Sequence, residues 1–527
     1  MSSRSFCSRL FSLFLVGLVG AFPAIAAAQT ADDAYRFSNR FPAVGTRATG
    51  MSGAGGVGGW ADPSALYTNP AGLGYYQASE FSGSLSGLLS RDKSTYQIFV
   101  DGPASQNTGD NATARLGHLT GIYNVDTERG SLVFALGFNR TSAFDRELSY
   151  SGQNSVSSIT DTFLPSGNGS VNTLPIVPFV AFQAGAIDTT GSGFVSLTRN
   201  IQQDGTVTSR DIQQDGTMTR GGSMNEFNFA GALEVAPNVM IGASANISYG
   251  TYVSESELTE TDLDGEDNYS VDTGDGPPLE DFQSMFFRER FTSDLTGFNL
   301  RLGLSANAAE DVRLGFTVET PTWYSIDETF TDAFIRTEFG NGSLAYGDDP
   351  DEDAARGKFQ YQLQTPWRLS TGVSYTRDPF LISADVEFVD WSQTRLDADE
   401  TEFDVTNETL EEYDYVVNWR GGIEYRSENG LSLRTGIAYR PGARGFDFTL
   451  ADGEETDRSR LFLSAGAGVQ LSERLSLNAA WMQERSTDQF RPYSSVRPPG
   501  ESKRIDVPFI DEDVVRNQIR VGFRYSF

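Results

Sequence analysis

The sequence is short of the residues on which most enzyme and metal sites depend. It has one cysteine, Cys7, and one histidine, His118. Without paired cysteines or clustered histidines, the chain is predicted to contain no disulfide and no metal site. No serine nucleophile motif accompanies the histidine, so no hydrolase site is predicted either. We therefore predict no enzymatic activity and no cofactor.

Long apolar helices and positive charge are also lacking. Beyond the N-terminal leader, charged residues interrupt every apolar stretch long enough for a transmembrane helix. The formal net charge is −31, which repels nucleic acid and excludes it as a partner. The chain is instead rich in glycine (54), phenylalanine (37) and tyrosine (20). This composition favours a β-barrel over soluble secreted domains.

Residues 1–28 are predicted to be a cleaved signal peptide. Arg4 and Arg9 supply a positive segment, an apolar run follows, and Ala26-Ala27-Ala28 is a small-residue cleavage site. The apolar run is too short for a stable membrane anchor. The one cysteine lies within this peptide, so the exported chain is predicted to have none.

The clearest structural signal is alternation with a period of two residues at the C-terminus. From Val515 to Phe527, apolar residues occupy one parity, and Arg516, Arg520 and Arg524 lie in the other. Three arginines on one face indicate a wet barrel lumen, with the apolar face turned to lipid. A terminal aromatic resembles the signal read by the outer-membrane barrel-assembly machinery, so Phe527 is predicted to be that assembly signal.

The same alternation recurs along the chain. It predicts an all-β fold, a transmembrane antiparallel β-barrel of about 14 strands, an even number as bacterial barrels have. The predicted strands are 78–100, 115–126, 131–140, 224–236, 239–254, 294–307, 311–320, 359–377, 380–393, 412–427, 430–440, 459–472, 475–487 and 514–527.

Connections between these strands alternate strictly between tight turns and long polar segments. The long segments are 101–114, 141–223, 255–293, 321–357, 394–411, 441–458 and 487–513. Outer-membrane barrels have short periplasmic turns and long external loops. We therefore predict a location in the cell outer membrane, with both termini in the periplasm.

The segment between the signal peptide and the first strand, residues 29–75, shows no strand alternation. Its stretch from Ala61 to Leu73 resembles the N-terminal signature of the FadL/TodX family of outer-membrane transporters for hydrophobic compounds. The most specific part is Asn69-Pro70-Ala71, followed by Gly72. Segments 365–375 and 384–392 also look like the strand openings of that family.

The resemblance implies a fourteen-stranded monomer in which residues 29–75 form a hatch, a plug inside the barrel of residues 76–527. It also implies that substrate enters from outside, binds an apolar pocket and leaves through a lateral opening into lipid at a kink in the third strand. Outer-membrane lipid and lipopolysaccharide would surround the barrel. We predict transport of a hydrophobic compound, such as a long-chain fatty acid or a hydrocarbon. A structural or adhesive surface protein and a general diffusion porin remain as alternatives.

Apolar groups in two polar segments and on the third strand are candidates for binding substrate. They are Ile176, Val177, Phe179, Phe182, Phe282, Phe286, Phe287, Phe134 and Phe138. Exposed apolar groups of this kind suggest a ligand groove, and a cap in which they pack against one another fits equally well. For the third strand, which is apolar on both parities, the alternative is packing against the plug.

Charged residues at inward parity are predicted to form ion pairs in the lumen. The candidates are Arg301, Arg313, Arg368, Arg420, Asp385 and Glu387, with Arg434, Arg524, Glu319 and Glu424 as further members. One arginine would suit a substrate carboxylate if the cargo is a fatty acid.

One octapeptide is nearly duplicated. Ile201 to Thr208 recurs as Ile212 to Thr219, and each copy contains an Asp-Gly turn signal. The pattern predicts a small hairpin extension or a tandem duplication.

Overall fold

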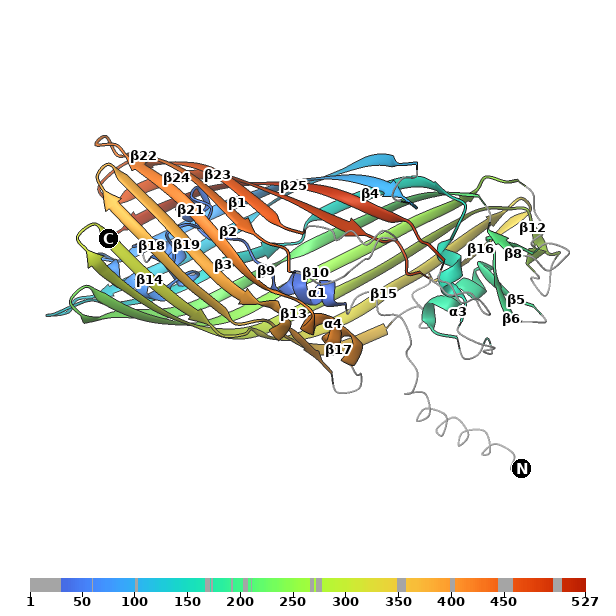
Figure 1. The fold of residues 1–527 in the computed structure, drawn as a ribbon, viewed down its shortest axis with the longest axis horizontal. Helices are drawn as coiled ribbons and strands as arrows, with labels where there is room; N and C mark the ends of the chain where they lie inside the picture. The colour runs from blue at the N-terminus through green and yellow to red at the C-terminus, as the bar shows by residue number, and fades with distance from the viewer. Residues whose placement is uncertain are drawn as a thin grey trace, which may run out of the picture.

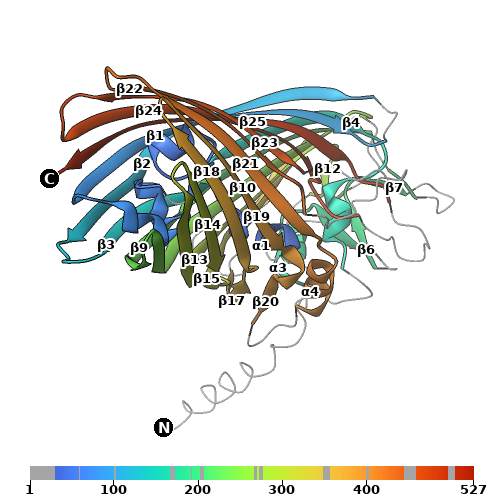
Figure 2. The same ribbon diagram turned by 60° about the vertical axis from the view of Figure 1, so that its left-hand side comes forward.

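The computed structural model is a closed barrel of fourteen antiparallel wall strands with the N-terminal segment inside it (Figures 1 and 2). Short turns and the C-terminus lie at one end, the short-turn end, and α3 with several small hairpins lies at the other, the long-loop end. The structure describes residues 30–58, 60–99, 103–165, 171, 174–190, 193–201, 207–209, 211–265, 270–271, 277–347, 357–398, 403–443, 458–495 and 505–527.

Each wall strand pairs with the next along the chain, and the last pairs with the first. The wall strands are β1 (Glu80–Gln97), β2 (Ser105–Val125), β3 (Leu132–Ala143) continued by β4 (Arg146–Asn154), β9 (Ile212–Ala236), β10 (Val239–Asp262), β13 (Phe282–Ala309), β14 (Val312–Glu319) continued by β15 (Trp323–Phe339), β17 (Gly357–Gln364) continued by β18 (Arg368–Arg377), β19 (Phe380–Asp390), β21 (Tyr415–Arg426), β22 (Leu431–Arg440), β23 (Arg460–Gln470), β24 (Leu475–Phe490) and β25 (Phe509–Ser526).

The predicted barrel of about 14 strands is confirmed, but the strands run further than predicted at the long-loop end. The predicted connection 321–357 contains β15 and β16 (Gly342–Tyr346), and β10 and β13 extend into the predicted connection 255–293. In these extensions the inner face carries buried apolar side chains such as Met285 and Ile335, and the outer face carries polar ones such as Asp327 and Arg336. The apolar parity thus changes from the outer to the inner face while the backbone ladder continues, and a prediction that follows the outward apolar parity ends too early.

Two prolines interrupt neighbouring wall strands at the same height. Pro321 separates β14 from β15, and Pro366 divides the predicted strand 359–377 into β17 and β18. Proline has no N–H to give to a ladder. The gap is bridged locally, since the Thr322 N–H donates to Thr365 Oγ1 (2.8 Å) and the Thr365 N–H donates to the Thr322 carbonyl (3.1 Å).

Outward-facing side chains form an apolar band around the barrel. On β1, Phe81, Leu85 and Leu89 are exposed, while on β25 the outward Val521 is 57% exposed and the adjacent inward Arg520 is 0% exposed. An outward apolar band roughly 25 Å tall over a polar interior is the pattern of transmembrane barrels. The parity predicted for the C-terminal strand is thus confirmed.

The N-terminal segment occupies the barrel interior as a plug, and we call residues 30–79 the hatch. Its elements are α1 (Ala31–Ser38), α2 (Thr46–Thr49) and the 3-10 helices η1 (Pro63–Leu66) and η2 (Pro70–Tyr75). Helix α1 begins with a capping box between Thr30 and Asp33. Most hatch side chains are buried against the wall. The predicted signal peptide lies outside the described residues.

Small elements gather at the long-loop end. They are η3 (Ile159–Phe163), α3 (Ile176–Gln183), the hairpins β5 (Ile187–Thr190) with β6 (Gly193–Ser196), β7 (Arg199–Ile201) with β8 (Val207–Ser209) and β11 (Ser270–Val271) with β12 (Leu279–Glu280), and η6 (Trp391–Gln393), β20 (Arg395–Asp397) and α4 (Asp404–Glu411). Among the described residues, no helix is long and apolar enough to cross a membrane.

The two copies of the duplicated octapeptide have different structures. The first copy contributes to the hairpin of β7 and β8, while the second lies within the continuous strand β9. A turn was predicted at Asp215-Gly216, but both residues pair with β10 and β4. The missing Cβ of Gly216 makes room for the ring of Tyr150, so the glycine serves packing and the predicted second turn is wrong.

Candidate functional site

The Asn-Pro-Ala sequence fastens the hatch to the wall. Asn69 caps η2, because its Oδ1 accepts from the Ala71 N–H (3.1 Å), and Pro70 occupies the first position of that helix. The same side chain donates from Nδ2 to the carbonyls of Val57 (2.7 Å) and of Leu304 on β13 (3.1 Å). Gly72 lies in η2, so all four predicted hatch residues belong to this attachment.

Wall glycines allow the hatch backbone to approach the wall directly. A Cβ on Gly303 would lie 2.0 Å from Asn69 Oδ1, and a Cβ on Gly315 would lie 1.7 Å from the Val57 carbonyl oxygen. Such separations are far inside van der Waals contact. Any side chain at these two positions would displace the hatch.

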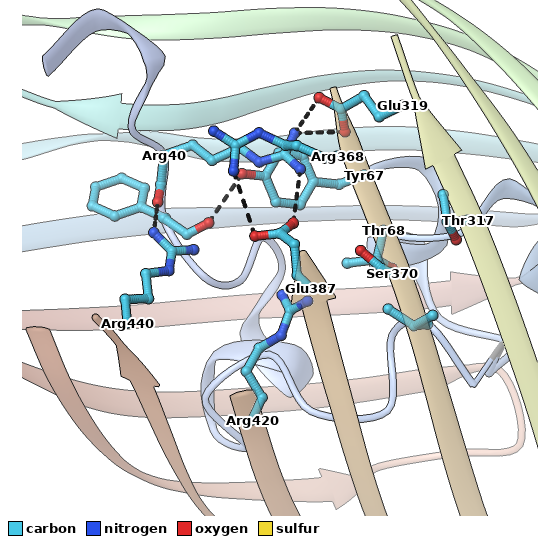
Figure 3. A pocket seen from close by; sticks show the side chains of 12 residues that line it. Arg40, Tyr67, Thr68, Thr317, Glu319, Arg368, Ser370, Glu387, Arg420 and Arg440 are labelled. Atoms are coloured by element: carbon cyan, nitrogen blue, oxygen red, sulfur yellow. Dashed lines mark hydrogen bonds and ion pairs between the residues drawn. The ribbon is translucent and has the colours of Figure 1, made fainter. Parts of the chain in front are cut away.

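A belt of buried charges surrounds the hatch at mid-height, and we call it the waist cluster (Figure 3). Its members are Arg40, Arg301, Arg368, Arg420, Arg440, Glu319 and Glu387. Hatch residue Arg40 donates to both oxygens of Glu319 (2.7 and 2.8 Å) and to Glu387 (3.3 Å). Arg440 donates to the Arg40 carbonyl. Among the described residues, members of the waist cluster line a cavity of about 10 Å³, smaller than the volume of one water molecule in the liquid.

All six predicted lumen charges contact the hatch. Arg301, Arg368 and Arg420 donate to hatch carbonyls, Glu387 accepts from Arg40, Asp385 accepts from the Gly55 N–H, and Arg313 stacks on Tyr75. The predicted ion pairs Arg301–Glu319 (2.9 Å) and Arg368–Glu387 (3.4 Å) are also present. The prediction omitted the hatch partners Arg40 and Arg47, since they lie in a segment without alternation and nothing there assigns a facing residue.

A second charged cluster lies below the waist, toward the short-turn end. Its centre is the buried Glu424 of β21, which accepts from hatch residue Arg47 (2.8 and 3.0 Å) and from wall residues Arg434 and Arg426 (both 2.5 Å). Next to this cluster is a cavity of about 570 Å³, lined by charged and apolar side chains and partly by turn residues such as Ser427. The lumen therefore has room for water below the hatch, on the short-turn side.

The apolar groups predicted in two separate loops come together at the long-loop end. Phe282 and Phe287 are buried in one apolar cluster, and Ile176, Val177 and Phe182 of α3 pack against it. Phe179 contacts Tyr346, and Phe286 contacts Phe334. The groups pack against one another and cap the barrel, as one of the two predicted alternatives required, and the faces of α3 remain partly exposed.

The third strand does not present its phenylalanines to the lumen. Phe134 is 52% exposed on the outer face, and Phe138 lies on the same face against Phe227. The inward residues are Val133 and Ala135, which pack against hatch residues in a small apolar cluster. Since both parities of this strand are apolar, its facing could not be assigned from the sequence, and the alternative of packing against the plug holds.

The hydrogen-bonded wall is broken along the third strand. The β2–β3 ladder ends at the pair His118–Asn139, and among the described residues the edge of β2 from Ser105 to Gly117 has no ladder partner on that side. The pairing of β3 with β9 shifts register between Arg140 and Ser142. Beyond this shift, β4 lies against β1 and β2, and the Ser94 hydroxyl of β1 donates to the Ser149 carbonyl of β4. The Ser90 hydroxyl donates to the carbonyl of Asp145, just before β4.

One ion pair spans this wall break. The Arg115 guanidinium of β2 donates to both oxygens of Asp145 (2.6 and 2.7 Å), which lies between β3 and β4. It also donates to the Gly222 carbonyl of β9 (3.0 Å). On β9, Gly221 and Gly222 lie between the pairs that hold β3 and β4, opposite the break, and nothing lies within 4 Å of a Cβ built on Gly221.

A buried carboxylate holds the loops at the far end of β10. Glu260 accepts from the Ser158 hydroxyl, the Ile159 N–H (2.9 Å) and Gln214 Nε2 (2.6 Å). It lies beyond the apolar band. Burial raises the pKa of Glu260 to about 7, against the lowering effect of its three donors.

This carboxylate should make the loop end more stable in acid. The pKa of Glu260 is higher in the folded state (about 7) than its ordinary value of 4.5, so folding is favoured while the group is protonated, and stability falls as the pH rises from about 4.5 to about 7. The difference is on the order of 3 kcal/mol.

We expect amide exchange in η3, corrected for intrinsic rates, to be slower at pH 5.5 than at pH 8. Glu260→Gln resembles the protonated acid, since its Oε1 can still accept from Ile159 and Gln214 while its Nε2 donates to Ser158 Oγ, and it should abolish the difference. An unchanged difference in this variant would assign it to another group.

Comparisons with known proteins agree with this geometry. A family model described as outer membrane protein transport protein (OMPP1/FadL/TodX) matches residues 25–489. Among solved structures, a Pseudomonas aeruginosa FadL homologue matches with a TM-score of 0.53 and 14% identity, covering 93% of this chain and 99% of that one. The P. putida toluene transporter TodX gives 0.49 and 13% (92% and 99% covered), and the Ralstonia pickettii toluene transporter TbuX gives 0.47 and 15% (92% and 99%). No curated protein sequence matches the chain.

Proposed function

Since the chain belongs to the OMPP1/FadL/TodX family of outer membrane transport proteins, it is a transporter and not an enzyme, and we propose that it moves hydrophobic compounds into the membrane through the break in its wall. The resemblance noted in the sequence is thereby confirmed. The short-turn end, which holds the C-terminus, faces the periplasm, and the long-loop end faces outward among lipopolysaccharide. The periplasmic location of the N-terminus stays a prediction, since α1, the first described element, packs against α4 of the long-loop end.

The observation that carries this proposal is the combination of a filled waist with an interrupted ladder in the wall. Among the described residues, buried side chains of the hatch and the waist cluster fill the lumen at mid-height around a cavity of about 10 Å³. The ladder between β2 and the third strand is absent over the outer half of β2. A water-filled pore does not help a hydrophobic molecule across the membrane, because the molecule is poorly soluble in water. Lateral passage is favourable, because the molecule partitions from water into lipid. A general diffusion porin would need the opposite arrangement.

The route begins at the apolar cluster of the long-loop end, where α3 offers partly exposed apolar groups for capture. It continues inward to the hatch and turns sideways at the break. The barrel acts as a monomer. Phe527, which is 64% exposed and donates its N–H to the Ser79 carbonyl (3.0 Å), serves as the signal for the barrel-assembly machinery.

Obstructing the outer side of the break tests this route. Gly221→Trp places an indole on the outer face of β9, opposite the break, where no atom lies within 4 Å of the new Cβ. Uptake of radiolabelled palmitate or toluene by cells lacking other transporters should fall to near background. The matched control is Gly121→Trp, which also has nothing within 4 Å but points outward from an intact ladder, and it should transport normally. Normal uptake by the Gly221 variant would rule out exit at this break.

A further inference from the structure

The third strand bends out of the wall where a straight path would complete the ladder. Among the described residues, β3 pairs with β2 only as far as Asn139, and the edge of β2 from Ser105 to Gly117 is left without a ladder partner. Backbone N–H and C=O groups without partners are unfavourable along a barrel edge, and a straight third strand would pair them. The bent path therefore requires contacts that outweigh the missing ladder.

Arg146, the first residue of β4, makes the largest set of such contacts. Its buried guanidinium donates from Nε to Asp92 of β1 (2.8 Å) and from Nη2 to Glu512 of β25. Its Nη1 also donates to Asp488 of β24 (3.5 Å). Around the barrel, β1, β25 and β24 lie one, two and three strands beyond β2. The arginine thus reaches past β2, the neighbour of a straight third strand, and ties β4 to the strands beyond it.

These ion pairs determine the path of the strand more than the stability of the barrel. Asp92 and Glu512 are 1% and 3% exposed, so their pairing with Arg146 does little more than offset the cost of removing the charges from water. A path that withdrew Arg146 would leave both carboxylates buried and unpaired, which is strongly unfavourable. The cluster therefore permits the bent path and excludes the straight one.

Asp145, the preceding residue, is held by a different strand. Its carboxylate accepts two hydrogen bonds from Arg115 of β2, and its carbonyl accepts from Ser90 Oγ of β1 (3.5 Å). Further along β4, the Ser149 carbonyl accepts from a hydroxyl of β1. Two consecutive residues of opposite charge thus bond to different strands, which fixes the direction of the corner between β3 and β4.

Glycines make room for β4 in this position. A Cβ on Gly109 of β2 would lie 2.2 Å from the Glu147 carbonyl oxygen, and a Cβ on Gly152 of β4 would lie 2.1 Å from the ring of Tyr96 on β1. Both separations are far inside van der Waals contact. The sequence is therefore adapted to a strand that lies against β1 and β2 from within.

We propose that Asp145 and Arg146 are the positioning residues of the wall break: their ion pairs hold β4 in the lumen, and without them β4 would pair with β2 and close the wall. The break is then a permanent interruption of the ladder that side chains maintain, and cargo does not have to create it. The path of the strand is argued from these contacts alone, and its consequence for uptake rests on the proposed function.

The test removes the ion pairs of Arg146 without leaving a buried carboxylate unpaired. In the triple variant Arg146→Met, Asp92→Asn, Glu512→Gln, the remaining Asp488 keeps its pair with Arg458 (3.3 Å). Amide hydrogen exchange is measured on the full-length protein in nanodiscs. The N–H groups of β2 that face the break should exchange roughly tenfold more slowly in the variant than in the wild type, because they enter a ladder. Uptake of radiolabelled palmitate should fall to near background.

Two further variants control for charge and for the loss of an ion pair. Arg146→Lys keeps a cation that can pair with Asp92 or Glu512, so it should retain the rapid exchange of the wild type and most of the uptake. Arg91→Met with Asp110→Asn removes an exposed ion pair between β1 and β2 on the outer surface. This double variant should change neither measurement.

Exchange decides the positioning role, and uptake decides the exit. If the triple variant does not form a barrel, Asp92→Asn replaces it, since Arg146 then keeps Glu512 and Asp488, and exchange should slow by a smaller factor. Unchanged or faster exchange along the β2 edge would overturn the proposal, because the loss of a merely structural cluster loosens its surroundings. Slower exchange with normal uptake would leave the positioning role intact and exclude the break as the exit.

Discussion

Replacing Gly315 by leucine is expected to drive the hatch from the lumen and leave an open pore. A Cβ at this position would lie 1.7 Å from the Val57 carbonyl oxygen and 3.1 Å from Asn69 Nδ2. The nearest atom belongs to the backbone, so no rotamer change relieves the clash. The hatch must shift as a body, and its attachments at Asn69 are lost with it.

The measurement is entry of hydrophilic solutes. Liposomes containing the variant should swell in small sugars, whereas those containing the wild type should not. Gly87→Leu is the control, because this β1 glycine faces outward and its Cβ meets nothing nearer than 3.9 Å. If the Gly315 variant folds into a barrel and remains closed to sugars, the hatch is not the barrier and the waist must be sealed by wall side chains.

Of the substitutions proposed, replacing Glu424 by alanine is expected to have the second largest effect, and this effect is on the stability of the folded barrel. Its carboxylate is paired with Arg47, Arg434 and Arg426, and two of these three arginines are buried. Glu424→Ala leaves buried cations unpaired, at a cost of about 3–5 kcal/mol. The variant should show a lowered unfolding temperature, read from the heat-dependent shift of the folded barrel on a gel.

The cost should depend on the hatch arginine. In the double variant Glu424→Ala with Arg47→Ala, part of the lost stability should return, because the second substitution removes one of the buried cations left without the Glu424 carboxylate. Asp110→Ala breaks the exposed ion pair with Arg91 on the outer surface and should leave the unfolding temperature unchanged. Equal losses in the single and double variants would mean that Arg47 and Glu424 do not act together.

The alternation of apolar and polar residues predicted most wall strands, because the facing of a side chain in a strand depends only on its position within that strand. Each residue of β25 faces lipid or lumen according to its parity, so the inward placement of Arg520 and Arg524 followed from the sequence. Parity could not assign the faces of β3, because both parities of that strand are apolar. It also missed β15, where buried apolar residues such as Ile326 and Ile335 face inward and polar ones such as Asp327 face outward.

The contacts of the candidate site could not be predicted in the same way. Arg40 and Arg47 find Glu319 and Glu424 across hundreds of residues of sequence, and the hatch has no periodic pattern to orient them. The sequence identified the inward-facing charges. That these charges bind the hatch could be seen only from the course of residues 30–79 in the structure. That the Arg520 guanidinium faces the Phe41 ring, with no hydrogen-bond partner among the described residues, is visible only once its neighbours are placed.

The seam of the barrel fixes an order of assembly. The ring closes by pairing β1 with β25 from Glu80–Ser526 to Gln97–Phe509, and the hatch directly precedes β1 in the chain. If β1 and β25 paired first, the hatch would have to enter through one end of a closed barrel. It would then have to pass wall glycines that its backbone contacts directly in the folded protein. The hatch must therefore be in place while the sheet is still open, with β1 and β25 not yet paired. Synthesis from the N-terminus supplies it in that order: the plug exists before the last strand, and the final residues enclose what the first ones have already positioned.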